Sequence, residues 1–111
     1  MKIEIREILM KDNNRVKQVL VNVMKEFGVP DQGTALQDNE LNFMYESYQL
    51  SSSKYYVVLL DGDIKGGGGI SKLKGSNEKI CELQKMYFLK DIRRKGIGSK
   101  LIKMCLDFAK K

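Results

Sequence analysis

Hydrophobic and polar positions along this chain repeat with two periods, one typical of strands and one typical of helices. The first eight residues alternate, with Ile3 and Ile5 between charged residues, which predicts a strand with one face in solvent. Apolar residues then recur every three or four positions from Val16 to Phe27, and the following Gly28 predicts the end of this helix. The pattern therefore predicts a strand followed by an amphipathic helix.

A second, shorter helix is predicted after a polar loop at residues 31–37. Asp12 or one of the two asparagines after it can cap the first helix, and Asp38 can cap the second, because their side-chain oxygens accept hydrogen bonds from unpaired helix amides. The second helix has one apolar face, which consists of Leu41, Met44, Tyr45 and Tyr48. The two tyrosines are predicted to pack in the core or at its rim.

Three β-prone segments follow. Residues 54–60 form a continuous apolar run, which predicts a strand covered on both faces, and Asp61-Gly62 predicts a hairpin that Asp63 can lengthen. The return strand at 64–70 contains four consecutive glycines, which predict a bulge or a close approach by another backbone. A flexible loop is the alternative interpretation of the glycines. Residues 80–89 predict the last strand.

The most informative stretch is the basic glycine turn at residues 93–99, Arg-Arg-Lys-Gly-Ile-Gly-Ser. It lies between the last predicted strand and a helix whose apolar face consists of Ile97, Leu101, Met104, Cys105 and Phe108. Glycines let a ligand lie against the backbone, and Gly98 falls in the first helical turn, where amides have no partner within the helix. This arrangement favours an anion, and a phosphate-bearing ligand in particular.

Composition narrows the chemistry. At 111 residues, 42% of them apolar, the chain is long enough for one domain with its own core. It has no histidine, which excludes histidine-based catalysis and disfavours a zinc or iron site. Cys81 and Cys105 fall in apolar segments, which predicts small buried residues rather than a disulfide. No apolar run approaches a membrane span and the N-terminus is unlike a signal peptide, so a cytoplasmic location is expected.

The turn also fits a known family motif. Arg93, Gly96 and Gly98 fill the pattern Arg/Gln-x-x-Gly-x-Gly/Ala, and the chain resembles the GCN5-related N-acetyltransferases, in which this pattern binds acetyl-CoA. The resemblance implies an α/β fold of the α+β type, with a mixed, mostly antiparallel sheet and the order β-α-α-β-β-β-α. It also implies that residues 1–111 form a single acyl-CoA-binding domain that lacks the family's C-terminal strand-helix-strand part.

The resemblance implies specific roles for the turn and for the strand before it. In the family, amides of the turn hold the coenzyme A pyrophosphate, and the backbone of the fourth strand pairs with the pantetheine arm and the acetyl carbonyl. The corresponding positions here are Met86, Tyr87, Phe88, Arg93, Arg94, Lys95, Gly96, Ile97, Gly98 and Ser99. Acetyl-CoA is the expected co-substrate, and no metal is expected.

Glu82 is the candidate catalytic residue. A lysine-like amine has a pKa of about 10.4 and must lose a proton before it attacks a thioester. Some family members place a glutamate base on the fourth strand at the same separation from the motif, and Glu82 matches that position. The alternatives are a solvent-facing glutamate or an ion-pair partner for Lys85. No residue is assigned as the acid that protonates the departing thiolate.

Three classes of function follow. The first is an acetyl-CoA-dependent N-acetyltransferase that acts on a primary amine of a small molecule or protein, with Tyr45 and Tyr48 as alternative lining residues of the acceptor pocket. The second is a non-catalytic module that holds coenzyme A or another nucleotide. The net charge of +6 also suits a nucleic acid, but no aromatic–basic interleaving or recognition-helix signature is present. No membrane partner is expected, whereas the open edge of the last strand predicts a homodimer or a completing segment.

Overall fold

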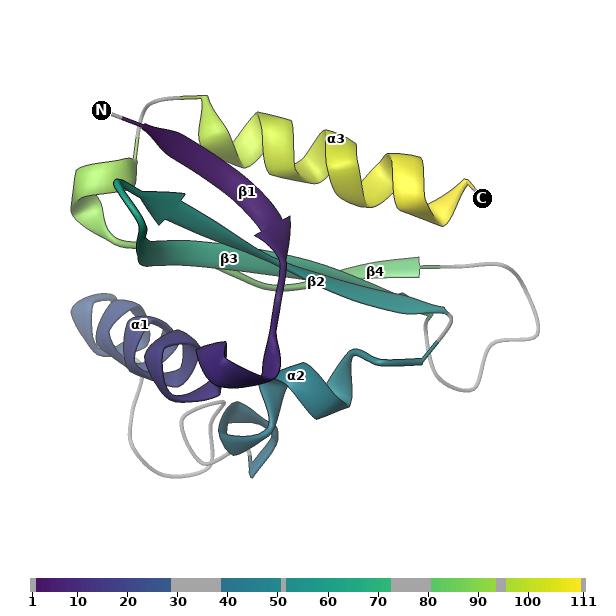
Figure 1. Ribbon diagram of the computed structural model, residues 1–111, viewed down its shortest axis with the longest axis horizontal. Coiled ribbons are helices and arrows are strands. Elements are labelled where there is room, and N and C mark those ends of the chain that lie inside the picture. Colours follow the sequence, from purple (N-terminus) through teal and green to yellow (C-terminus); the bar gives the residue numbers. More distant parts are fainter. Residues whose placement is uncertain (1, 29–38, 51, 73–80, 94–95, 111) are drawn as a thin grey trace.

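The computed structural model describes residues 2–28, 39–50, 52–72, 81–93 and 96–110. Four strands form one sheet in the order β1-β2-β3-β4, with α1 and α2 on one face and α3 on the other (Figure 1). The elements are β1 (Ile3–Glu7), α1 (Asn13–Glu26), α2 (Met44–Ser47), β2 (Ser53–Leu60), β3 (Asp63–Lys72), β4 (Cys81–Phe88) and α3 (Ile97–Ala109). Short 3-10 helices occur at Met10–Asp12, Asn39–Asn42 and Lys90–Ile92.

This arrangement confirms the predicted α/β class and element order. All three pairings between the described strands are antiparallel. The second helix is a single turn preceded by a 3-10 segment, and the predicted cap Asp38 lies outside the described residues, as do the predicted loop at 31–37, Ile80, Arg94 and Lys95. None of the described helices is long and apolar enough to cross a membrane.

The predicted hairpin between β2 and β3 is confirmed. Leu60 pairs with Asp63, so the turn contains only two residues. Both adopt positive φ, 51° at Asp61 and 87° at Gly62, which is the turn geometry that matches the twist of an antiparallel pair. The return strand is continuous through its glycines, so the alternative of a flexible loop is wrong. The predicted bulge is present beside the glycines, because Val58 pairs with Gly66 and Leu59 with Ile64, which leaves Lys65 as an extra residue.

The four glycines of β3 make room for large side chains on both faces of the sheet. A Cβ on Gly67 or Gly69 would lie 2.8 or 2.7 Å from the Tyr55 ring. On the other face, a Cβ on Gly66 would lie 2.6 Å from the Phe88 ring, and one on Gly68 would lie 2.9 Å from the Met86 methyl group. The close approach that the glycines predicted is thus made chiefly by side chains, which pack where a Cβ would stand.

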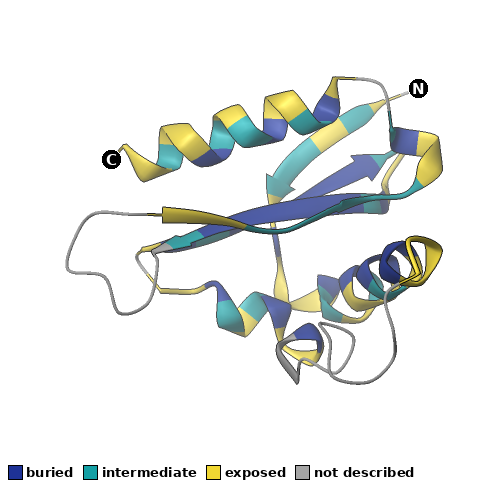
Figure 2. Cartoon of the chain, turned by 180° about the vertical axis from the view of Figure 1, so that it is seen from behind, coloured by how far each residue is buried: buried dark blue, intermediate teal, exposed yellow. Residues whose placement is uncertain are grey.

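Buried apolar residues form a core on each face of the sheet. Figure 2 shows buried positions along the middle strands and along the helices. The core under α1 and α2 includes Val19, Leu20, Val23, Met24, Met44, Tyr48 and Tyr55. The core under α3 includes Val58, Ile92, Ile97 and Leu101. Cys105 is buried as predicted, and both cysteines are free thiols, but the prediction for Cys81 is wrong because the first three residues of β4 are exposed.

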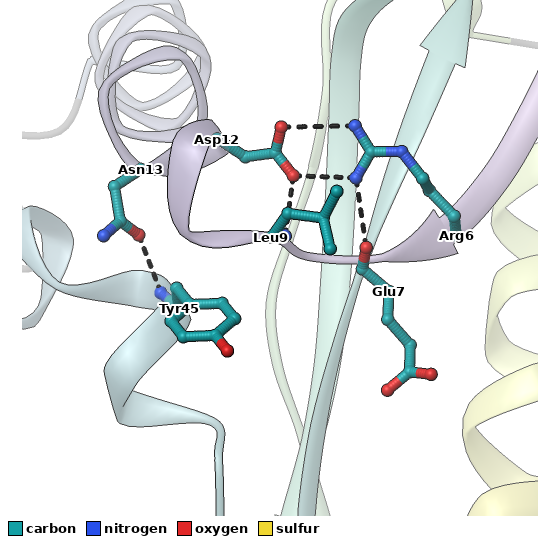
Figure 3. A network of polar contacts seen from close by, with 6 residues as sticks. All are labelled: Arg6, Glu7, Leu9, Asp12, Asn13 and Tyr45. Carbon is teal, nitrogen blue, oxygen red and sulfur yellow. Dashed lines mark hydrogen bonds and ion pairs between the residues drawn. The ribbon is translucent and has the colours of Figure 1, made fainter.

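Polar contacts at the start of α1 help to fix where α2 lies (Figure 3). Arg6 donates two hydrogen bonds, of 2.7 and 3.2 Å, to the Asp12 carboxylate, which also accepts one from the Leu9 amide at 2.7 Å. Asp12 therefore stands at the predicted cap position of α1, but its carboxylate accepts hydrogen bonds from preceding residues instead of from the helix amides. Asn13 accepts a 2.7 Å hydrogen bond from the Tyr45 amide in the first turn of α2. The start of α1 thereby holds α2 against the sheet.

The pKa of Asp12 reflects this network. Burial by itself raises the pKa of the carboxyl, but the hydrogen bonds from Arg6 and from the Leu9 amide outweigh it and hold the pKa below the usual 3.8. Asp12 is therefore ionised at neutral pH. The charged pair with Arg6 is consequently part of the native packing of α1.

We expect Gly67→Ala to lower the free energy of unfolding by about 1–3 kcal/mol, the usual cost of inserting a methyl group into packed surroundings. The new Cβ would lie 2.8 Å from the Tyr55 ring and from the Tyr56 carbonyl oxygen. The matched control is Gly98→Ala, whose Cβ would be 3.9 Å from Phe88 within a helix. We expect this variant to be as stable as the wild type or up to about 1 kcal/mol more stable. Urea unfolding measures both, and equal stabilities would contradict the packing described.

Candidate functional site

A bulge in β4 is the first feature of the candidate site. Gly67 pairs with Tyr87 and Gly69 with Gln84, so Lys85 and Met86 together stand opposite one residue of β3. Lys85 has a φ of 47°, which is rare for a residue with a side chain. An inserted residue reverses the alternation of a strand. Gln84 accordingly contacts α2, whereas Met86, two positions later, packs with the core under α3.

Tyr55 of β2 binds the backbone of this bulge. Its hydroxyl donates a 2.9 Å hydrogen bond to the Lys85 carbonyl. The side chain is 1% exposed, and burial raises the pKa of the phenol well above 10. The hydroxyl therefore stays protonated at physiological pH and remains a donor to the bulged backbone.

Glu82 lies at the exposed beginning of β4 and belongs to a chain of side-chain hydrogen bonds. Its Oε1 accepts a 2.8 Å bond from Gln84 Nε2. Gln84 Oε1 in turn accepts a 2.7 Å bond from the Tyr48 hydroxyl. The Tyr48 ring packs against that of Tyr55, with centroids 5.1 Å apart. Tyr48 is buried and Tyr45 half-buried, which confirms the predicted core and rim positions.

The start of α3 is open toward a ligand. Gly96 precedes the helix with a φ of 72°, and a Cβ built there would meet nothing within 4 Å. No side chain caps this helix start, and no acidic residue lies in its first turn. The amides of Ile97, Gly98 and Ser99 therefore lack a partner within the helix and give this end a partial positive charge. Ile97 can contribute only its backbone, because its side chain is buried in the core.

Arg93, which the motif places among the ligand contacts, has protein partners for its guanidinium. Nε donates to the Phe88 carbonyl at 2.7 Å, and the two terminal nitrogens donate to the Glu26 carboxylate at 2.7 and 3.0 Å. The group also lies over the Phe27 ring, 5.0 Å from its centroid. Arg93 thus ties the end of β4 to the end of α1. These contacts use three of the five guanidinium N–H groups.

The other predicted positions divide between the two faces of β4. Met86 and Phe88 pack toward α3, and Tyr87 packs toward α1. All three are half-buried, and no other described strand pairs with the outer edge of β4. Two pockets, of about 140 and 490 Å³, share Glu7, Lys54 and Phe108. Tyr48 lines the smaller one, but neither pocket is lined by Glu82 or by a predicted coenzyme-binding residue. The candidate site is therefore an edge of the sheet rather than an enclosed cavity.

The described residues contain no group of three or more histidine, cysteine, aspartate or glutamate residues that could hold a metal ion.

Sequence reasoning missed three contributors to the site, namely Tyr55, Gln84 and Glu26. Tyr55 had a detectable signal, because a large aromatic residue in a strand next to a glycine-rich strand often packs over the glycines. The Glu26–Arg93 pair joins residues 67 positions apart, and no local pattern indicates it.

Comparison with known proteins identifies the family. Residues 17–111 match the model of the acetyltransferase (GNAT) family. The chain belongs to the GNAT family. It is 41% identical over 106 residues to the uncharacterized N-acetyltransferase YjgM of Escherichia coli K12, a match that covers 95% of this chain and 64% of YjgM. The chain thus spans just under two thirds of the length of this curated relative.

Solved GNAT structures share the fold. A GNAT acetyltransferase of Staphylococcus aureus Mu50 superposes with a TM-score of 0.82 at 19% identity, over 98% of this chain and 66% of the other. The structure of a predicted acetyltransferase with acetyl-CoA from Clostridium acetobutylicum gives 0.76 at 15% identity, over 98% and 74%. At these identities the likeness confirms the GNAT fold and says nothing further about the ligand.

We expect Glu26→Gln to lower the melting temperature at pH 7, because it removes the charge that binds Arg93. The hydrogen bonds from Arg93 lower the pKa of Glu26 from its usual 4.5. The folded pKa lies below the unfolded one, so this stabilisation is complete above pH 4.5 and is lost as the pH falls through the folded value.

The melting temperatures of wild type and variant should therefore converge in acid, which differential scanning calorimetry between pH 7 and pH 3 measures. Glu4→Gln, the same change at an exposed position of β1, is the control and should show no such convergence. A difference between wild type and Glu26→Gln that persists unchanged to pH 3 would contradict the pairing.

Proposed function

We propose that this chain forms the acetyl-CoA-binding part of an N-acetyltransferase that moves an acetyl group directly to a primary amine. The observation that supports this proposal most is the succession of a bulged edge strand, a glycine with positive φ and an uncapped helix start, in a chain of the GNAT family. Residues 1–111 act as one domain in this proposal.

The pantetheine arm of the coenzyme would bind along the outer edge of β4. Its two amide groups are able to pair with strand backbone in the same way as an added peptide strand. The positions assigned to this pairing are Met86 and Phe88, with Tyr87 between them. A strand amide directed at the acetyl oxygen would also stabilise the negative charge that develops there during transfer.

The pyrophosphate would bind at the start of α3. The space beside Gly96 admits a group that a Cβ at this position would exclude, and the amides of Ile97, Gly98 and Ser99 donate to phosphate oxygens. Arg94 and Lys95 are assigned to the same contact by the motif. Arg93 is also assigned to it, but its amide donates to the Lys90 carbonyl, so it would contribute positive charge while its side chain braces the turn.

Glu82 would act as the general base. It removes a proton from the ammonium form of the acceptor, directly or through a water molecule. The neutral amine nitrogen then forms a bond to the acetyl carbon and loses a second proton, the carbon–sulfur bond breaks, and the leaving thiolate takes up a proton, so that one proton is released per turnover. The products are the acetylated amine and coenzyme A. No described residue is assigned to protonate the thiolate.

Binding of acetyl-CoA tests the first half of the proposal. At a concentration 100 times the dissociation constant, we expect a stabilisation of about 2.7 kcal/mol, measured by thermal or chemical unfolding. Gly96→Glu should abolish it, because the side chain fills the phosphate space and its charge repels the phosphates. Gly28→Glu is the matched control, since Gly28 also has positive φ, 77°, with nothing within 4 Å of an added Cβ.

The control variant should lose as much intrinsic stability as Gly96→Glu and keep the full response to acetyl-CoA. Equal responses of the two variants, or no response of the wild type, would contradict the proposed site. Turnover is tested by thiol release with a panel of primary amines. Binding without thiol release, and without any effect of Glu82→Gln, would instead favour a module that holds coenzyme A and transfers nothing.

A further inference from the structure

We infer that Gln84 is a positioning residue that, together with Tyr48, fixes the Glu82 carboxylate in the orientation in which it takes up the substrate proton. The inference rests on the proposed function, because it assigns a role to neighbours of the proposed base. Its physical basis is the continuous set of hydrogen bonds from the Tyr48 hydroxyl through the Gln84 amide to Glu82.

The direction of these hydrogen bonds is determined by chemistry. An ionised carboxylate only accepts, so the Gln84 amide must turn its NH₂ group toward Glu82. Its carbonyl oxygen then faces Tyr48, whose hydroxyl must donate. A reversed amide would place an acceptor against the carboxylate and lose that bond, although the Tyr48 hydroxyl could still accept a hydrogen bond from the NH₂ group. One orientation of Gln84 therefore satisfies both neighbours at once.

We call the hydrogen bonds from Tyr48 through Gln84 to Glu82 the relay. Its Tyr48 end is rigid. Tyr48 is 4% exposed, and its ring packs against that of Tyr55. It immediately follows α2, whose first turn is held by the hydrogen bond from the Tyr45 amide to Asn13. Through Gln84, the buried Tyr48 thereby restricts the motion of the Glu82 side chain at the exposed start of β4.

The β4 bulge makes the relay possible. Without the inserted residue at Lys85 and Met86, Gln84 and Met86 would point to the same face, because side chains two apart along a strand share a face. The bulge leaves Glu82 and Gln84 on the face of α2 while Met86 turns toward α3. Gln84 is therefore placed between a buried tyrosine and an exposed glutamate.

The expected consequence is a defined rotamer for Glu82. An exposed glutamate ordinarily samples many rotamers, and each unproductive one lowers the fraction of productive encounters. With Oε1 bound to Gln84, Oε2 is the oxygen that makes no hydrogen bond to any described residue and faces the substrate proton. This arrangement provides one acceptor oxygen in one place, which is what general-base catalysis requires.

The first test is kinetic. Gln84→Met keeps the length of the side chain and removes both hydrogen bonds. We expect kcat to fall about tenfold, a part of the roughly 10²–10⁴-fold that a general base contributes, while the KM for acetyl-CoA stays within about twofold. Tyr48→Phe, which keeps the ring, should give a smaller loss. Gln18→Met, the same change on the exposed face of α1, should have no effect.

A double variant separates positioning from a general effect on the fold. In a Glu82→Gln background, Gln84→Met should cause no further loss of kcat, because no base remains to be positioned. An equal tenfold loss in both backgrounds would overturn the inference while leaving the proposed function intact. So would an unchanged kcat in Gln84→Met when Glu82→Gln is strongly impaired.

A second readout needs no turnover. Three-bond NMR couplings should show a single χ1 rotamer of Glu82 in the wild type and averaged couplings in Gln84→Met. Averaged couplings in the wild type, or unchanged ones in the variant, would overturn the relay. A wild type that binds no acetyl-CoA and releases no thiol would instead overturn the proposed function, and with it the catalytic role of Gln84. The NMR couplings would still show whether the hydrogen bonds hold Glu82 in one rotamer.

Discussion

The side chain of Tyr55 lies across β3 on one face of the sheet. Its ring packs against Gly67 and Gly69, and its hydroxyl donates a hydrogen bond to the Lys85 carbonyl of β4. Any larger residue at either glycine would push the ring away from β3. The buried hydroxyl, in turn, needs an acceptor, and the bulged backbone of β4 supplies it. The glycine run, the tyrosine and the bulge are therefore one structural unit, and each component depends on the other two.

This unit determines where the proposed chemistry lies. The bulge puts Glu82 and Gln84 on the face of α2 and turns Met86 and Phe88 toward α3. One edge strand thus carries the proposed base on one face and packs on the other against the helix whose start is the proposed pyrophosphate site. Arg93, which follows β4, stabilises the next part of the proposed site. Its bonds to Phe88 and Glu26 brace the turn that leads to Gly96.

Local patterns in the sequence predicted the elements and the glycine turn because both depend on short-range physics. Helical periodicity indicated α1 and α3, Asp61-Gly62 indicated the hairpin, and Gly96 stands where a positive φ is required. The bulge, the Tyr55 contact and the Glu26–Arg93 pair were not predictable in this way, since each joins elements distant in sequence. The burial of Cys81 was predicted wrongly because the apolar residues around it in sequence do not reveal that it lies at the exposed start of an edge strand.

Assignment of backbone amide signals during a titration with acetyl-CoA tests most directly whether β4 and the start of α3 form one coenzyme site. The account predicts that the largest chemical-shift changes occur together at the amides of Met86, Tyr87 and Phe88 and at those of Ile97, Gly98 and Ser99. Changes confined to the pockets lined by Glu7, Lys54 and Phe108, or no changes at saturating acetyl-CoA, would contradict it.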